Sequence, residues 1–244
     1  MYADDLLLLS ASMLDLQKML DICSSVGEDL GMKFNASKSM CIVIGPYQNL
    51  CFSNLTLGNM SLPWVESLEY LGICILKDNQ FRIDLSNVRR KFFTSVNNIL
   101  SKCTYTSDIV KLSLMESYCL PILLYASESL YLPYSQLADI NAWWNSVYRK
   151  IFNYNKWESV KLLICLLGRI DLFHIYNLRS MNFILRLAKN EFLHYEYKLF
   201  VDLFINSKEC TYTFSKYKCS RYMKFYEVRN RVYEDYNIFC STKM

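Results

Sequence analysis

The sequence predicts an α+β fold in which short strands come first and helices follow. Up to about residue 80, short apolar runs are separated by polar, turn-rich segments, which is typical of strands and hairpins. Beyond that point, apolar residues recur every three or four positions, as they do on one face of a helix. The chain has 244 residues, 52% of them apolar, and only six glycines and four prolines, so we expect a packed core rather than a disordered chain.

The first expected element is a β-hairpin that carries two adjacent aspartates. Residues 1–2 would end one strand, residues 3–5 would form the turn, and the leucine run at residues 6–9 would be a buried return strand. Adjacent carboxylates repel each other, which costs free energy. A cation placed between the carboxylates and a substrate would offset this repulsion. Mg²⁺ prefers oxygen ligands, so Asp4 and Asp5 are candidate metal ligands. The other interpretation is an ordinary turn, where aspartate is common.

A helix is expected next, from about residue 13 to residue 30. Ser12 is a suitable N-cap with Asp15 three positions later, and Gly31 is a suitable C-terminal stop. The apolar positions with helical spacing are Leu16, Leu20, Cys23, Val26 and Leu30.

The rest of the first part predicts further strands. Residues 32–39 read as a strand followed by a turn that carries Lys38, and residues 40–44 read as a second strand. A polar, turn-rich segment continues to Pro63. Residues 67–76 then predict one strand, in which Gly72 would permit close backbone approach.

From Arg82 the pattern becomes helical. The first helix carries an apolar stripe (Leu85, Val88, Phe92, Val96 and Ile99) beside three consecutive cations (Arg89, Arg90 and Lys91). Further helices are expected at about 107–118, 134–153, 158–166 and 171–203, and a basic, aromatic tail follows. We therefore expect three regions, at residues 1–80, 81–205 and 206–244.

Charge and cysteine usage limit the class of protein. The net charge is −5 over residues 1–80 and +9 over the remainder, which suits a cation site beside a polyanion-binding surface. The ten cysteines are irregularly spaced and form no zinc motif, so reduced thiols are expected, and His174 and His194 are expected to be packed or surface residues. Neither a signal segment nor a run of about 20 apolar residues is found. We expect an intracellular protein, in the nucleus or cytoplasm, with no membrane partner.

Four strings, in the same order and spacing, resemble the reverse transcriptases of non-LTR (LINE-type) retrotransposons. Residues 2–5 (Tyr-Ala-Asp-Asp) match the catalytic hairpin of the palm domain. Residues 31–39 are similar to the next palm motif, Gly-Leu-x-x-Asn-x-x-Lys-Thr/Ser, and residues 70–72 match the Tyr-Leu-Gly of the primer-grip hairpin. Residues 120–128 are similar to a downstream string, Leu-Pro-x-Leu-x-Tyr-Gly-x-Glu. The resemblance covers residues 1 to about 190 and implies the end of a palm followed by a helical thumb and C-terminal region.

The resemblance implies an RNA-directed DNA polymerase that uses two-metal chemistry with Mg²⁺. Asp4 and Asp5 would hold the metal, and Lys38 would approach the phosphates of the incoming deoxynucleoside triphosphate. Tyr2, Tyr70, Leu71 and Gly72 would contact the primer or nucleotide, and Arg89, Arg90 and Lys91 the backbone of the RNA template and DNA primer. These residues also have purely structural interpretations. Lys38 would then be an exposed turn lysine, residues 70–72 part of a plain buried strand, and residues 89–91 part of a solvated helix face. Trp143 and Trp144 are expected to be core residues rather than a base-stacking platform.

The departure from the family concerns the metal site. Its polymerases supply a further aspartate from an earlier strand and a fingers region, whereas here only Met1 precedes Tyr2, and residues 81–84 (Phe-Arg-Ile-Asp) follow the hairpin and should open a helix. We therefore expect an incomplete two-metal site and no primer extension by this chain alone. Two other hypotheses are a non-catalytic helical module that binds nucleic acid or a partner, and a remnant without activity.

Overall fold

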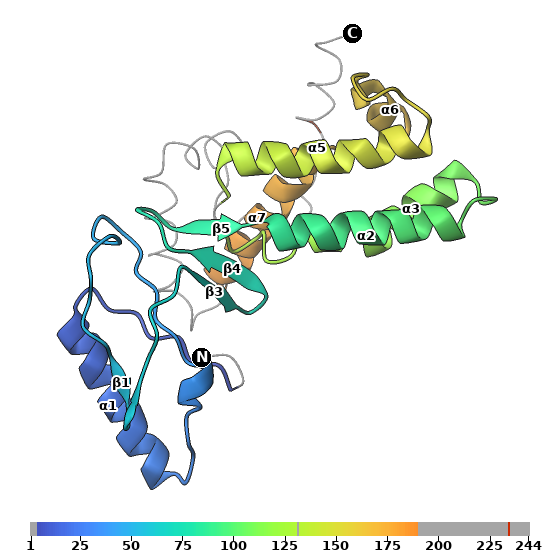
Figure 1. Cartoon of the computed structure of the whole chain (residues 1–244). Coiled ribbons are helices and arrows are strands. Elements are labelled where there is room, and N and C mark those ends of the chain that lie inside the picture. The colour runs from blue at the N-terminus through green and yellow to red at the C-terminus, as the bar shows by residue number, and fades with distance from the viewer. Residues whose placement is uncertain (1–3, 131, 190–233, 235–244) are drawn as a thin grey trace. The chain divides into compact units, whose positions relative to one another are not determined.

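The computed structural model describes residues 4–130, 132–189 and 234 of the chain (Figure 1). It divides into two compact units, Met1–Ser86 and Asn87–Met244, which are described separately. In the described residues the first unit has one long helix and short antiparallel strands, and the second is helical. The predicted α+β class, with strands before helices, is confirmed.

The first helix, α1 (Met13–Asp29), begins as predicted. The Ser12 side chain accepts a hydrogen bond from the Asp15 N–H at 3.4 Å, and thus satisfies one of the free N–H groups of the first turn. The Ser12 N–H is bound by Ser10 Oγ at 3.1 Å, and the Asp15 carboxylate pairs with Lys18 at 3.2 Å. Two serines that precede the helix, Ser10 and Ser12, therefore satisfy backbone N–H groups at its start.

The end of α1 is a Schellman motif. Gly31 has a φ of +68°, and the Met32 N–H donates to the Gly27 carbonyl at 2.7 Å across the end of the helix. Glycine is suited to this position because it has no Cβ to clash in the left-handed conformation. The predicted apolar stripe is only partly buried, because Val26 and Leu30 are exposed.

A small core lies between α1 and the hairpin formed by β1 (Thr56–Leu57) and β2 (Met60–Ser61). The Gln17 side chain pairs with both backbone groups of Thr56, at 2.9 Å each, and so ties α1 to β1. The buried residues of this core are Leu20, Cys41, Leu55, Leu57 and Leu62.

Three predicted strands of this unit are wrong. Residues 6–9 and 32–34 have no regular secondary structure, and Leu9 is 77% exposed. Of residues 40–44, only Cys41 pairs with another segment, in an isolated parallel bridge with Trp64. An apolar run becomes a strand only where a neighbouring strand takes its backbone hydrogen bonds, and among the described residues these runs lack such a neighbour.

The strand predicted over residues 67–76 is in fact a hairpin. β3 (Ser67–Tyr70) pairs antiparallel with β4 (Ile73–Leu76), with Tyr70 opposite Ile73. Leu71 and Gly72 form the two-residue turn with φ values of +49° and +77°, as in a type I′ turn. The apolar pattern alone did not reveal this turn, whereas the resemblance of residues 70–72 to the primer-grip hairpin implied one.

The helix expected from Arg82 begins later. β5 (Arg82–Asp84) pairs with β4, which places Ile83 opposite Ile75 and buries it, and α2 (Ser86–Lys102) follows. Pairing with the preceding strand overrides the local helical periodicity here. Asp84 ends the strand and accepts two hydrogen bonds from Ser86, through the backbone N–H at 2.9 Å and the hydroxyl at 2.6 Å.

The described helices of the second unit agree with the predicted order. After α2 they are α3 (Asp108–Tyr118), α4 (Leu120–Leu123), α5 (Tyr134–Ile151), α6 (Lys161–Leu166) and α7 (Leu172–Lys189). Ser107 caps α3, and the prediction of a helix at about residues 107–118 is confirmed. Residues 190–203 of the last predicted helix, and the predicted tail apart from residue 234, lie outside the described residues.

α2 and α5 lie side by side around the main core of this unit (Figure 1). Arg89 and Asn97 of α2 contact Trp143 and Lys150 of α5 respectively, so the two helices run in the same direction. The largest side chains of this core are fully buried: Trp144, Tyr148, Phe92, Leu112, Met115, Leu124, Ile140, Leu172 and Met181.

Candidate functional site

The two adjacent aspartates are available to a ligand. Asp4 lies in a turn and Asp5 follows it, and both are exposed. Neither carboxylate has a hydrogen-bond or ion-pair partner within the part of the chain that the structure describes. Their oxygen chemistry suits Mg²⁺, but the described residues contain no group of three or more histidine, cysteine, aspartate or glutamate side chains that could hold a metal ion. Tyr2 lies outside the described residues.

Lys38 is exposed at the end of a short 3₁₀ helix, η1 (Ala36–Lys38). Asn35 precedes η1 and accepts hydrogen bonds from Ser37, at 3.1 Å from the N–H and 2.6 Å from the hydroxyl. The conformation around Lys38 is therefore set by a local cap. Among the described residues, Lys38 forms no ion pair with either aspartate, and its approach to the phosphates stays a prediction.

The residues predicted to contact the primer lie together at the end of the β3–β4 hairpin. Tyr70 ends β3, and Leu71 and Gly72 make the turn. Leucine rarely adopts a positive φ, which costs about 1–2 kcal/mol for a residue with a Cβ. Leu71 is thus a strained, half-buried turn residue and Gly72 an exposed one, rather than parts of the plain buried strand that was the other interpretation.

Arg89, Arg90 and Lys91 are all exposed on α2, and the Arg89 guanidinium lies over the Trp143 ring at 5.7 Å. Trp144 is 1% exposed, so the prediction of a core tryptophan is confirmed for Trp144. Trp143 is only half-buried, and its ring lies beneath the Arg89 guanidinium.

Asp84 has a structural role. The Ser86 hydroxyl and then the Ser86 N–H hold the pKa of the Asp84 carboxyl below its usual range. These are the same two hydrogen bonds that join the end of β5 to the start of α2. The carboxylate thus links the end of β5 to the start of α2, whereas residues 81–84 were expected to open a helix.

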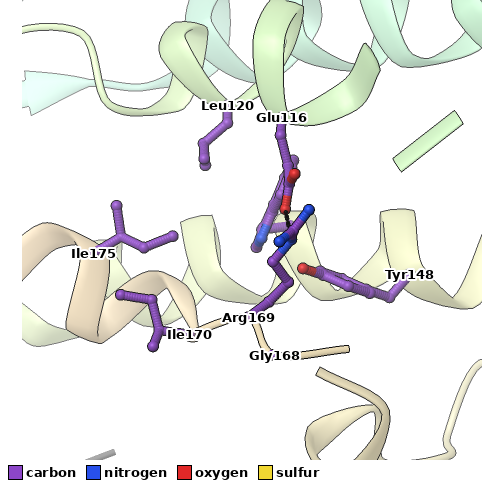
Figure 2. A pocket seen from close by; sticks show the side chains of 8 residues that line it. Glu116, Leu120, Tyr148, Gly168, Arg169, Ile170 and Ile175 are labelled. Carbon is purple, nitrogen blue, oxygen red and sulfur yellow. Dashed lines mark ion pairs between the residues drawn. The ribbon is translucent and has the colours of Figure 1, made fainter. Parts of the chain in front are cut away.

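A polar pocket of about 110 Å³ lies in the second unit and was not predicted (Figure 2). Arg169 Nε pairs with Glu116 Oε1 at 2.8 Å, and the Tyr148 hydroxyl points toward this pair. Burial, followed by the Glu116 carboxylate, raises the pKa of Tyr148, while Arg169 and the Trp144 indole act in the opposite direction. The Trp144 N–H meets no partner with hydrogen-bond geometry among the described residues. The cluster joins α3, α5 and the segment before α7.

The segment after α4 is held by α7. The Arg179 guanidinium donates to the Leu124 carbonyl at 3.3 Å, and Arg186 pairs with Glu128 at 2.9 Å. Between these contacts, Ala126 has a φ of +54°. Ala126 occupies the position at which the string typical of LINE-type enzymes has glycine.

Replacing Ala126 with glycine is expected to raise the free energy of unfolding of the second unit by about 0.5–1 kcal/mol. The gain from removing the left-handed strain exceeds the added entropy of the unfolded chain. Urea titration followed by circular dichroism measures the change. Ala142→Gly in the exposed middle of α5 is the matched control, and we expect it to lose about 1 kcal/mol. A loss at both positions would contradict the strain at Ala126.

The remaining predictions concern single residue types. The described cysteines are free, as expected, and His174 is buried beside Asp171, so its prediction as a packed residue is confirmed. His194 lies outside the described residues. Within the described part, every helix is too short or too polar to cross a membrane.

Comparison of the chain with protein-family models, with curated proteins and with solved structures gives no match.

Proposed function

We propose that the chain derives from an RNA-directed DNA polymerase of the non-LTR retrotransposon type, with Asp4 and Asp5 as metal-binding carboxylates. The proposal rests on the four strings described above, which occur in the order and spacing of that family. When bound, Mg²⁺ would activate the primer hydroxyl and stabilise the leaving pyrophosphate.

The observation that carries the proposal is the backbone at three positions of these strings. Gly31, Gly72 and Ala126 have φ values of +68°, +77° and +54°. The family patterns have glycine at all three positions, and a glycine is required only where the chain takes a positive φ or approaches another group closely. The glycine positions of the family patterns thus coincide with positive φ values in this chain, so the backbone conformation supports the resemblance in addition to the residue types.

Metal binding tests the role of Asp4 and Asp5. The double variant Asp4→Asn/Asp5→Asn is expected to abolish a class of bound Mn²⁺ in the intact chain, measured by water-proton relaxation. The matched control is Glu28→Gln/Asp29→Asn, which removes another exposed, adjacent acidic pair and should leave that class unchanged. Equal Mn²⁺ binding by the wild type and the Asp4/Asp5 variant would overturn the metal-binding role.

Primer extension completes the same test. We expect none from this chain alone with Mg²⁺, because two carboxylates are fewer than a two-metal site requires. Extension that Asp4→Ala abolishes would contradict this expectation of inactivity and would support the polymerase chemistry directly.

A second candidate function is a non-catalytic nucleic-acid-binding module, favoured by the surface of α2 and α5. All four charged residues of α2 are basic and exposed: Arg89, Arg90, Lys91 and Lys102. Lys150 of α5 lies over the Phe93 ring at 5.5 Å and donates to Asn97 at 3.3 Å. Cations held in place on aromatic rings suit a polyanion. Under this function, Asp4→Asn/Asp5→Asn would leave nucleic-acid binding unchanged, whereas Arg89→Gln/Arg90→Gln would weaken it.

A further inference from the structure

The connection between α5 and α6 presents a tryptophan on an ordered turn. Trp157 is 87% exposed, and its neighbour Lys156 places the ammonium group 4.8 Å from the centre of the Trp157 ring. Residues 155–158 form a β-turn in which these two side chains occupy the central positions, closed by a hydrogen bond from the Glu158 N–H to the Asn155 carbonyl at 3.1 Å. One of the four tryptophans of the protein therefore projects from the apex of a turn.

Side-chain hydrogen bonds hold this turn in one conformation. The Glu158 carboxylate accepts two hydrogen bonds from Asn155, at 2.9 Å from the N–H and 2.7 Å from the side-chain amide. The same contacts, the side-chain bond first, lower the pKa of Glu158, so the carboxylate stays ionised and keeps both bonds at neutral pH. Arg149 Nε donates to the Glu158 carbonyl at 2.9 Å.

The end of α5 fixes where the turn begins. Asn153 has a φ of +56°, and the Tyr154 N–H donates back to the Arg149 carbonyl at 3.0 Å, which is the Schellman pattern already seen at the end of α1. Arg149 therefore contacts both the helix end and the turn. A rigid support matters because a side chain that is already ordered loses less entropy when it binds a partner.

The charge around the turn favours an anionic partner. Residues 149–161 contain four basic side chains and one acidic side chain, and the acidic one, Glu158, is engaged by Asn155. Lys156 covers one face of the Trp157 ring, while the high exposure of Trp157 leaves indole surface open for a second planar group. An aromatic ring flanked by cations is the arrangement with which proteins stack bases of single strands.

We propose that the turn at residues 155–158 is a base-stacking site for single-stranded nucleic acid, in which Trp157 stacks on one base and Lys156 contacts an adjacent phosphate. The site is formed by the second unit alone. It does not require metal binding by Asp4 and Asp5, so it stands whether or not the polymerase proposal holds.

The test compares two labelled ligands on the intact chain by fluorescence anisotropy. One is a thymidine oligonucleotide, and the other is an abasic oligonucleotide of the same length and charge. Trp157→Ala is expected to bind the thymidine oligonucleotide roughly tenfold more weakly, the usual consequence of losing one stacked base, and the abasic one with unchanged affinity. Trp157→Phe should retain most of the wild-type affinity.

Two control variants separate stacking from charge and from exposure. Tyr105→Ala removes another fully exposed aromatic side chain of the same unit and should change neither affinity. Lys156→Gln should weaken both ligands and reduce the salt dependence by about one phosphate contact.

Three results would overturn the proposal. They are an unchanged affinity of Trp157→Ala for the thymidine oligonucleotide, an equal loss for both ligands, and a Trp157-dependent preference for anionic lipid vesicles over the oligonucleotide. The last result would assign the turn to a membrane surface, where tryptophan and lysine also occur together.

Discussion

Replacing Trp144 with alanine is expected to lower the free energy of unfolding of the second unit by about 3–5 kcal/mol. The Trp144 ring is 1% exposed and lies 5.8 Å from the Tyr148 ring, edge to face, and 6.5 Å from the Phe92 ring. Its removal would leave a cavity between α2 and α5 that these rigid neighbours cannot fill. Chemical denaturation followed by the helical circular dichroism signal measures the loss.

The control for Trp144→Ala uses the same chemical change at an exposed position. Trp157→Ala removes an identical side chain that is 87% exposed, and we expect a change of no more than about 0.5 kcal/mol. The pair therefore tests burial with the substitution held constant. A loss below about 1 kcal/mol for Trp144→Ala would show that the described packing of α2 against α5 is wrong.

Replacing Arg169 with methionine is expected to lower the free energy of unfolding by about 1–2 kcal/mol. Methionine preserves much of the packing volume but leaves the Glu116 carboxylate, 25% exposed, without its partner at 2.8 Å. Because the Arg169 side chain is itself 42% exposed, water reduces the effect below that of a buried pair. Urea titration at neutral pH gives the value (Figure 2 shows the pair).

A second arginine serves as the matched control for Arg169→Met. Arg186 pairs with Glu128 at 2.9 Å, but these side chains are 55% and 36% exposed, so Arg186→Met should cost less than about 0.5 kcal/mol. The double variant Glu116→Gln/Arg169→Met should recover part of the Arg169→Met loss, because no charge is left unpaired. Equal losses for the two arginines would contradict a special role for the partly buried pair.

The predictions that were confirmed rest on local chemistry. Ser12 caps α1 as predicted, because a serine hydroxyl can accept a backbone N–H of the first turn wherever the rest of the chain lies. Ser107, which was not predicted as a cap, does the same for α3. Gly31 ends α1 for an equally local reason, since only its own φ is involved. The helices from α3 to α7 follow the apolar period of the sequence, and burial of Trp144 follows from its place on the apolar face of α5.

The predictions that were wrong depended on pairing with another segment of the chain. Residues 6–9 and 40–44 have the composition of strands, but pairing requires a neighbour, and among the described residues only Cys41 finds one. Arg82–Asp84 has a helical period yet pairs with β4, which is visible only once the hairpin at Leu71 and Gly72 has formed. A strand is stabilised between segments, so its existence cannot be read from one segment alone.

The same distinction applies to the candidate sites. For these sites the amino-acid sequence provides the order of the residue types, namely the adjacent Asp4 and Asp5, the Tyr-Leu-Gly string and the basic run of α2. Only the tertiary structure showed that Arg169 meets Glu116 beside Tyr148, and that Arg149 and Glu158 hold Trp157 at the apex of a turn. Adjacent residues meet through covalent geometry, whereas distant ones meet only where packing has already offset the entropy of bringing them together.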